Sequence, residues 1–469
     1  MLRAALLGHQ GWLLSSSSTR VLVDPLLTAG FGHGGLAGAV FPGRVIDLGR
    51  LSPIDAVFLT HEHDDHFDIA SILRLDRRIP ILISARSSFA LSEFLRAHGF
   101  EVRRLEPNSV TRVGDLDLQV FVADHRTTPD ADEWDVLPFI VSDATRQGVF
   151  ASSVDVPMPS TMLEVLVEMP GWPGVVCIAN NTTDTRFVTR GAGVLSRSDD
   201  TEALARVLVC RFDAWARRLE LPRFIAITGG GWRHPPELEW VDTLAFSVEP
   251  GRLASSLSKA LGTRVHAMLP GEGIALEGSR TTDISESAVS LQGPSEREGQ
   301  ARVEVPPLPS PALRRTAADD DETRLAAGLE RFARFLYGRE VFTQVHSLAS
   351  TDALAFVLHR ASSPIVFAYR PWAGDFERVT TPDAFVRYAC GFECWAVDLL
   401  ALFEGRLAAS ALCYTGRLRC WNHLPAQLRV SPQLLWLFSH PLHQPKTARA
   451  LYDHVAEHCG PVAIEVQAR

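Results

Sequence analysis

The sequence predicts an α/β fold in which two sheets pack face to face between outer helices, followed by a separate α+β module. Strand and helix signals of both antiparallel and parallel type continue to residue 268. The stretch 278–314 then becomes rich in Gly, Pro, Glu and Arg, as in a linker or surface arm. New helix and strand patterns begin near residue 323. We therefore divide the chain into a domain over 1–280, a linker or arm over 281–322, and a C-terminal module of unknown role over 323–469.

Short apolar, β-branched runs bounded by turn residues predict the strands of the first domain. Asp24-Pro25 ends one of them, and residues 143–147 join two others as a hairpin. The predicted strands cover 4–7, 11–14, 20–23, 54–59, 79–84, 101–104, 110–113, 116–122, 138–142, 148–152, 175–179, 224–228 and 264–268. Apolar residues at helical spacing predict helices over 67–73, 87–98, 162–168, 203–219 and 252–261.

The C-terminal module combines both periodicities. We expect helices over 324–337, 382–389 and 446–458, and strands over 353–359 and 365–369. Three further segments are expected to form a strand meander, over 395–403, 407–414 and 417–422. Cys390 and Cys394 lie four residues apart, a spacing that suits one face of a helix.

The composition excludes several classes of protein. Of the 469 residues, 46% are hydrophobic and 22% charged, and the net charge is −9. This charge argues against a general binder of nucleic acid or anionic membranes. No apolar run approaches the roughly 20 residues of a membrane helix, and the N-terminal run is expected to be a strand, not a signal peptide. Seven cysteines, an odd number in a long chain, favour reduced core residues and a cytoplasmic location.

The most informative stretch is Thr60-His61-Glu62-His63-Asp64-Asp65-His66. It joins a predicted strand to a predicted helix, so a rigid scaffold aims its side chains. Imidazoles and carboxylates at H-x-H-x-D-H spacing rarely coincide in a solvated loop, and they predict a metal site. Because residues two apart face the same side of an extended backbone, we expect His61 and His63 to share one metal. Asp65 and His66 then turn toward a second.

With these residues, the first 280 residues resemble the metallo-β-lactamase superfamily. The segment Gly8-His9-Gln10-Gly11-Trp12 and the later Val23-Asp24-Pro25 resemble one branch of that superfamily. The branch contains lactonases and phosphodiesterases similar to ascorbate-6-phosphate lactonase and N-acyl-phosphatidylethanolamine phospholipase D. The resemblance implies a four-layer αββα sandwich over residues 1–280, with the C-terminal α+β module as an extension that it does not cover.

The resemblance also implies further metal ligands. A third histidine of the first metal site is expected at His125, just after a strand. A bridging aspartate is expected at Asp155, although Val154-Asp155-Val156 departs from the Gly-Asp-Thr that is more frequent in the family. The last ligand is expected at His234, after the triple glycine 229–231, with His266 as the competitor. If neither histidine binds, a single-metal enzyme becomes the alternative.

Other residues receive supporting roles. Asp24 and His9 are expected behind the ligands, where a carboxylate fixes the tautomer of a metal-bound histidine. Asp24 is equally well explained as part of an Asp-Pro turn. Substrate contacts are expected from Arg126, Trp232 and Arg233, which stand beside proposed ligands. The polar stretch 180–186 is more easily explained as an ordinary loop.

The leading hypothesis is a binuclear metallohydrolase with a small-molecule ester, lactone, amide or phosphodiester substrate. Asp65 and Asp155 are its catalytic carboxylates. Imidazole and carboxylate ligands suit two divalent ions, zinc in the first place and iron or manganese as alternatives. The second hypothesis is a di-iron oxygenase on the same fold, and the third is a non-catalytic, metal-stabilised interaction protein. We expect no nucleic-acid or membrane partner. If the chain forms homo-oligomers, we expect the C-terminal module to provide the contact.

Overall fold

The computed structural model describes most of the chain. The described residues are 1–33, 37–124, 133–180, 185–217, 219–278, 280–297, 302–313, 321–337, 354–381, 383–423 and 430–459.

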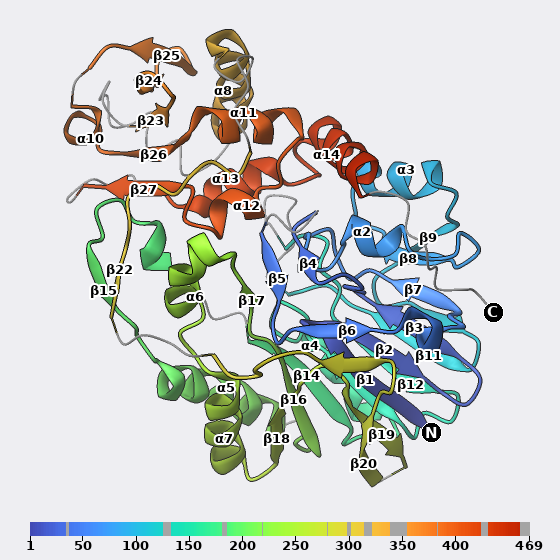
Figure 1. Cartoon of the computed structure of the whole chain (residues 1–469). Coiled ribbons are helices and arrows are strands. Elements are labelled where there is room, and N and C mark those ends of the chain that lie inside the picture. Colours follow the sequence, from blue (N-terminus) through green and yellow to red (C-terminus); the bar gives the residue numbers. More distant parts are fainter. Residues whose placement is uncertain are drawn as a thin grey trace.

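One sheet of the N-terminal domain is built largely from the first hundred residues (Figure 1). Its described strands follow the order β20 (Arg280–Ser285), β19 (Glu272–Glu277), β1 (Leu2–Gly8), β2 (Gly11–Ser15), β3 (Arg20–Val23), β7 (Ala56–Phe58), β8 (Ile81–Ser84) and β9 (Val102–Leu105). The pairs from β20 to β3 are antiparallel, and those from β3 to β9 are parallel. This sheet carries the histidine-rich loop at the end of β7.

The second sheet is formed by later segments. Its described strands follow the order β10 (Val110–Val113), β11 (Leu116–Val120), β12 (Phe139–Asp143), β13 (Val149–Ser152), β14 (Val175–Asn180), β16 (Phe224–Gly229) and β18 (Arg264–Ala267). β12 and β13 form the predicted antiparallel hairpin, and the pairs from β13 to β18 are parallel. Asp155 lies just beyond β13.

The two sheets pack face to face because successive strand residues point to opposite sides. On β1, Leu6 enters the core between the sheets, whereas Leu7 faces the outer helices. Helices on the outer side of the first sheet are α1 (Leu48–Leu51), α2 (Ile69–Ile72) and α3 (Phe89–Ala97). Those outside the second sheet are α4 (Ser160–Glu168), α5 (Thr201–Ala216) and α7 (Pro250–Leu261). This is the αββα sandwich of the metallo-β-lactamase fold, as predicted.

Short elements cover one end of the sandwich. Small sheets join β4 (Gly30–Phe31), β5 (Gly38–Val40) and β17 (Trp232–Arg233), then β6 (Arg44–Ile46) and β21 (Val289–Leu291), then β15 (Val194–Ser196) and β22 (Arg302–Glu304). Beside them lie η1 (Thr185–Val188), η2 (Pro236–Leu238) and α6 (Glu239–Ala245).

The stretch assigned to a linker or arm contains regular structure. β20 pairs with β19 at the edge of the first sheet, β21 pairs with β6, and β22 pairs with β15. Paired edge strands can be strongly polar, because one face of an edge strand meets solvent. Their polar composition therefore gave no strand signal. The division at residues 280 and 322 stays a prediction.

The C-terminal module has a sheet of its own, with helices against it. The described strands follow the order β25 (Asp375–Val379), β24 (Ile365–Arg370), β23 (Leu354–His359), β26 (Cys390–Trp395) and β27 (Arg419–Asn422). The helices are α8 (Glu322–Tyr337), α10 (Ala384–Arg387), α11 (Ala396–Glu404), α12 (Ser410–Cys413), α13 (Pro432–Ser439) and α14 (Pro445–His458).

The predicted strand meander is wrong in its first two segments, which form α11 and α12. Residues of α11 are buried all round, so this helix has no polar face to reveal its period. It ends at Gly405, whose φ of 70° suits glycine. The helical spacing of Cys390 and Cys394 is also wrong, because both lie on β26, buried in the core of the module. All seven cysteines, each within a described segment, are free.

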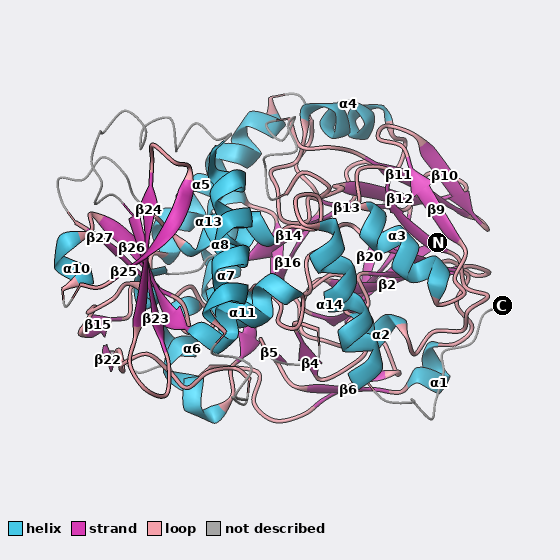
Figure 2. Ribbon diagram, turned by 90° about the horizontal axis from the view of Figure 1, so that it is seen from above, coloured by secondary structure: helices cyan, strands magenta, loops and turns pink. Residues whose placement is uncertain are grey.

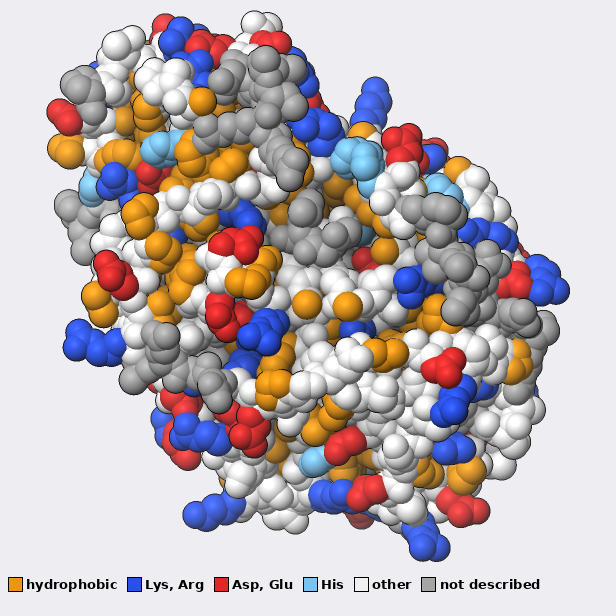
Figure 3. Space-filling model, viewed as in Figure 1, with side chains coloured by type: hydrophobic (Ala, Val, Ile, Leu, Met, Phe, Trp, Pro, Cys, Tyr) orange, Lys and Arg blue, Asp and Glu red, His pale blue; other side chains and the backbone are white. Residues whose placement is uncertain are grey.

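The module lies against one end of the sandwich (Figure 1), and its last helix joins the helices on the outer side of the first sheet. α14 lies beside α2 and α3 (Figure 2), and Ala448, Tyr452 and Val455 belong to the core of that outer helical layer. Within the described segments, no helix is both long and apolar enough to cross a bilayer. On the face shown in Figure 3, Lys and Arg side chains are scattered among Asp and Glu.

Candidate metal centre

The histidine-rich loop forms a tight turn between β7 and α2. The backbone N–H groups of His66 and Phe67 both donate to the carbonyl of His63, at 3.0 and 2.7 Å. Asp68 then accepts from the backbone N–H of Ser71 and caps α2. The turn brings His61 and His66 side by side, with ring centroids 4.0 Å apart.

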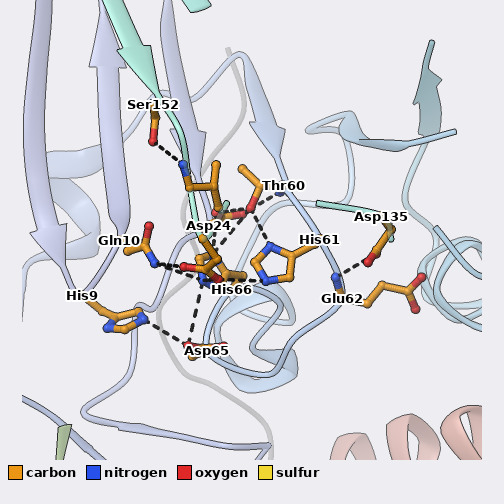
Figure 4. Close-up of polar contacts among 12 residues, drawn as sticks. His9, Gln10, Asp24, Thr60, His61, Glu62, Asp65, His66, Asp135 and Ser152 are labelled. Carbon is orange, nitrogen blue, oxygen red and sulfur yellow. Dashed lines mark hydrogen bonds and ion pairs between the residues drawn. The ribbon is translucent and has the colours of Figure 1, made fainter. Parts of the chain in front are cut away.

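Figure 4 shows His61 and His66 side by side behind Thr60 and Asp24. Both also lie close to an aspartate that follows a strand of the other sheet. Asp155 Oδ2 lies 3.3 Å from His61 Nε2 and 3.2 Å from His66 Nε2. Both histidines are fully buried, and the side chain of Asp155 is 11% exposed. We call His61, His66 and Asp155 the inner donor group. One ligand atom from each lies within 4.8 Å of the others, which suits a single metal ion.

A buried network orients the histidines of the inner donor group. Asp24 accepts from the backbone N–H of Thr60 at 2.8 Å and from its hydroxyl at 2.6 Å. Its Oδ2 also lies 2.8 Å from His66 Nδ1. Because the Thr60 hydroxyl donates to Asp24, it accepts from His61 Nδ1 at 3.0 Å. Both rings therefore carry a proton on Nδ1 and turn Nε2 toward Asp155, the orientation that a metal ligand needs.

Gln10 fixes the remaining member of the group. Its Nε2 donates to Asp155 Oδ1 at 2.6 Å, which leaves Oδ2 facing the two imidazoles. Gln10 lies in the turn between β1 and β2, so the first sheet holds an aspartate that the second sheet supplies.

A second set of ligand atoms shares His66. His9 Nε2 lies 3.1 Å from Asp65 Oδ2, which lies 3.9 Å from His66 Nε2. We call His9, Asp65 and His66 the outer donor group. Asp65 is the most exposed member, at 22% of its side chain. Its atoms also lie within 4.8 Å of one another. Because His66 Nε2 has one lone pair, it binds one ion at a time, and an ion in the inner donor group leaves His9 and Asp65 as further ligands beside it.

The charges around His66 favour a cation. Burial by itself lowers the pKa of an imidazole. The carboxylates of Asp155, Asp65 and Asp24 nevertheless raise the pKa of His66 well above its usual value. Burial raises the pKa of a carboxyl, yet His66 and His61 hold the pKa of Asp155 well below its usual range. A site that stabilises a protonated imidazole among ionised carboxylates also suits a divalent ion with the same ligands.

The remaining side chains of the loop are not members of either donor group among the described residues. His63 packs its ring against His61 at 4.5 Å and against Trp436 at 5.3 Å, and it belongs to neither group. The expected sharing of one metal by His61 and His63 stays a prediction, because the third expected ligand, His125, lies outside the described residues. It assumed an extended backbone, whereas residues 61–66 form a turn that places His66 beside His61.

Glu62 and Asp64 are buried carboxylates on the same loop. Burial and the charge of Asp135 raise the pKa of Glu62 to about 7. Burial and the charge of Asp65 raise the pKa of Asp64 to about 7. Both side chains are held by hydroxyl groups, Glu62 by Ser88 and Asp64 by Ser410. Neither carboxylate belongs to a donor group.

Neither candidate for the last ligand reaches the donor groups. His234 is buried with Nδ1 2.6 Å from Asp242 Oδ1 and Nε2 3.3 Å from Trp232 Nε1. His266 lies on β18, 43% exposed, with Nε2 2.9 Å from Glu272 Oε2. The glycines before His234 have φ of 75°, 88° and 93°, and a Cβ on Gly231 would overlap the ring of Phe246. Glycine at these positions therefore permits the positive φ angles and the close approach of the chain to Phe246.

The predicted substrate residues lie in three different environments. Trp232 is buried, and its ring is 6.3 Å from that of His9. Arg233, next on the same short strand, faces solvent and pairs with Glu239 at 3.2 Å. His125 and Arg126 lie outside the described residues, as does most of the 180–186 loop. Asn180 donates to the carbonyl of Val248 at 3.3 Å.

Sequence reasoning missed the direct place of His9 and Gln10 in the centre. His9 has a φ of 53° and follows Gly8 at 136°, a turn that aims the ring at Asp65. The signal was present in Gly8-His9-Gln10-Gly11, where polar residues between glycines interrupt two apolar strands. Such a pattern indicates an unusual turn but does not identify the ligand that it faces. The expected supporting role of Asp24 matches the contacts observed.

Comparison with known proteins agrees with the architecture. Residues 19–166 match the family model of the β-lactamase superfamily domain. The matched segment includes both His61 and Asp155, but it excludes His9 and the whole C-terminal module. No curated protein matches the chain in sequence.

Several solved structures are similar to the sandwich. A possible metal-dependent hydrolase from Veillonella parvula is 17% identical, with a TM-score of 0.40, covering 59% of this chain and 100% of that one. An isothiocyanate hydrolase from Delia radicum gut bacteria is 15% identical, with a TM-score of 0.39, covering 59% and 99%. CmlA, a diiron β-hydroxylase from Streptomyces venezuelae, is 15% identical, with a TM-score of 0.35, covering 60% and 54%. Likenesses this distant do not transfer an activity to the chain.

Proposed function

We propose that the chain is a metal-dependent hydrolase that cleaves an ester, lactone, amide or phosphodiester bond with two divalent ions, zinc in the first place. The observation that carries the proposal is the convergence of the two donor groups on His66. A structural zinc site is closed by its protein ligands, whereas the ligands of a catalytic site leave positions for water and substrate. Five ligand atoms in two overlapping groups fit the second description.

The chemistry divides between the ions and the side chains. Bound divalent ions lower the pKa of water toward about 7 and polarise the oxygen of the scissile group. Asp155, oriented by Gln10, sets the position of the inner site. Asp65 is the more exposed carboxylate, so it is placed to orient the attacking water, while His66 and His9 hold its pKa below the usual range despite burial. His9 holds Asp65 in place through the 3.1 Å contact.

The surroundings of Trp232 support a substrate with an apolar part. Trp232 contacts His9 on one side and lines a cavity of about 280 Å³ on the other. Other walls of this cavity come from Phe246, Tyr414 and Pro432. We therefore keep Trp232 as a proposed substrate contact. Arg233 pairs with Glu239 at the surface, and its expected contact with substrate stays a prediction.

The direct test combines metal analysis with turnover. Protein purified without added metal is analysed for bound elements and assayed with bis(p-nitrophenyl) phosphate and p-nitrophenyl acetate. We expect close to two zinc ions per chain, and turnover that a chelator removes and zinc restores. His61→Ala should lose both metal and turnover, whereas His266→Ala, which alters an exposed histidine remote from the donor groups, should keep both.

Two outcomes would contradict the proposal. Turnover that survives in His61→Ala after its metal is lost would remove the metal from the reaction. Bound iron with a visible absorption band, and no hydrolysis of either probe, would favour the di-iron oxygenase hypothesis instead.

A further inference from the structure

The C-terminal module contacts the metal-binding loop at the positions between the ligands. In the sequence His61-Glu62-His63-Asp64-Asp65-His66, the intervening acids Glu62 and Asp64 are 4% and 6% exposed. Each accepts a hydrogen bond from a hydroxyl of the C-terminal module, more than 300 residues along the chain. Buried carboxylates are costly unless they are hydrogen-bonded, so these contacts affect whether the loop keeps its shape.

The first contact joins α12 to the loop. Ser410, 1% exposed at the start of α12, donates its hydroxyl to Asp64 Oδ2. Asp64 precedes Asp65 of the outer donor group in the chain. The hydroxyl therefore holds the backbone at the point where the loop turns from His63 to Asp65.

The second contact joins α14 to the loop. Tyr452, 2% exposed, donates its hydroxyl to Glu62 Oε2 at 3.2 Å. The same oxygen accepts from the Ser88 hydroxyl at 2.7 Å, at the N-terminus of α3. Glu62 thus ties together the loop, the first domain and the last helix of the chain.

The third contact reaches the backbone of the loop. The N–H of Glu62 donates to Asp135 Oδ2 at 3.1 Å, and Asp135 Oδ1 lies 3.7 Å from His440 Nε2. Both Asp135 and His440 are buried. His440 follows α13, which also places Trp436 against the ring of His63.

We propose that Ser410, Tyr452 and His440 are positioning residues of the metal centre, and that the C-terminal module holds the ligand loop in its metal-binding shape. The proposal rests on the metal centre of the proposed function but not on the reaction assigned to it. None of the three residues belongs to a donor group. Ser410 and Tyr452 contact Asp64 and Glu62, which neighbour ligands in the chain. His440 acts through Asp135, which accepts from the backbone N–H of Glu62.

The expected size of the effect follows from comparable sites. Removing an outer partner of a metal ligand typically weakens metal binding about 10- to 100-fold. Here each partner acts one residue away from a ligand, so we expect the lower end, about 10-fold for a single hydroxyl. A module that only packs against the sandwich would instead lower the stability of the metal-free protein and leave its metal affinity unchanged.

The test measures zinc affinity in the full-length protein by competition with a chromophoric chelator. Ser410→Ala and Tyr452→Phe each remove one hydroxyl, and Ser410→Thr restores it at the same position. The matched controls are Ser439→Ala and Tyr369→Phe. Ser439 donates to the carbonyl of Leu435 in its own helix, and Tyr369 lies in the core of the module. Thermal unfolding of each metal-free variant gives its stability separately.

We expect Ser410→Ala and Tyr452→Phe to bind zinc about 10-fold more weakly than the wild type, and Ser410→Thr and both controls to bind within about 2-fold of it. Equal affinities in the hydroxyl-deletion variants and the controls would overturn the proposal. Should Ser410→Ala fail to fold, Tyr452→Phe decides. A wild-type protein that binds no zinc would contradict the metal centre itself. A wild-type protein that binds zinc, with variants that bind it equally well, would contradict only the role of the C-terminal module.

Discussion

The inner and outer donor groups share His66 but differ in how firmly their members are held. In the inner group, Asp24, Thr60 and Gln10 fix each ligand from behind. In the outer group, Asp65 is 22% exposed and its oxygen lies 3.9 Å from His66 Nε2. The difference indicates that the inner site is ready for an ion before one binds. For the outer group it predicts that the ligands adjust as an ion arrives, as suits a position that exchanges water for substrate.

The supports of the two groups come from different parts of the fold. The inner ligands follow β7 and β13, whose buried neighbours leave them little freedom. His9 lies on a turn with positive φ, and its carbonyl accepts from the N–H of Gly229 at 3.1 Å. The glycine-rich segment therefore supports the outer group through its backbone, although His234 at its end does not join the group.

The largest expected effect comes from the histidine that both groups share. His66→Ala removes the nitrogen on which the inner donor group depends and which lies next to the outer one, so we expect zinc affinity at the inner site to fall by more than about 100-fold, beyond the range for an outer partner. Elemental analysis of the purified variant measures the loss. Retention of the full metal content would show that His66 is not a ligand.

The next effect separates the two groups. His9→Ala removes a ligand atom from the outer group only, so the variant should keep about one ion of two, held by His61, His66 and Asp155. Isothermal titration with zinc should show one class of sites in place of two. Loss of both ions would mean that the groups are not independent, and unchanged binding would return His9 to a supporting role.

A smaller effect is expected behind the inner group. Asp24→Asn keeps the shape of the side chain but replaces one accepting oxygen by a donor, which disturbs the tautomer of His66. Zinc affinity at the inner site should fall about 10- to 100-fold, with little change at the outer one. Asp283→Asn, on the exposed strand β20, is the matched control. Equal behaviour of the two variants would argue that Asp24 only shapes the Asp-Pro turn.

The smallest effect concerns a buried histidine near the outer group. Burial lowers the pKa of His33 to about 3, and the charge of Asp65 opposes this only in part. The unfolded chain takes up a proton below about pH 6.5, whereas the folded chain does not until about pH 3. The contribution of His33 to the free energy of unfolding is therefore fully present above about pH 6.5. It decreases as the pH falls, by roughly 2 kcal/mol at pH 5.

The variant His33→Asn tests this pH dependence, because asparagine tolerates the φ of 49° at this position. Urea unfolding of the metal-free proteins at pH 7 and pH 5 gives the two stabilities. The wild type should lose roughly 2 kcal/mol more than His33→Asn over this interval. Parallel losses would show that His33 is protonated in the folded protein.

The sequence predicts the sandwich well because its strands bury one or both faces and alternate with helices of clear period. The prediction fails where the hydrophobic pattern of a segment does not indicate its secondary structure. The residues of α11 are buried all round, and a continuous apolar run does not distinguish a helix from a strand. The polar strands β20 to β22 carry little hydrophobic signal.

The site shows the same limit. The spacing of His61 and His66 identifies a metal site, and the order of strands suggests Asp155. The contact of His9 with Asp65 joins residues 56 positions apart, and that of Ser410 with Asp64 joins residues 346 apart. Such pairs depend on how the sheets and the C-terminal module pack, which no local pattern encodes.

The most direct test of the metal centre is anomalous X-ray diffraction from a zinc-loaded crystal, recorded on both sides of the zinc absorption edge. We expect one peak between His61, His66 and Asp155, and a second beside His9 and Asp65. The two peaks should lie about 3.5–4 Å apart, as in other two-metal sites. A peak beside His234 or His266, or no peak among these five donor residues, would contradict the account.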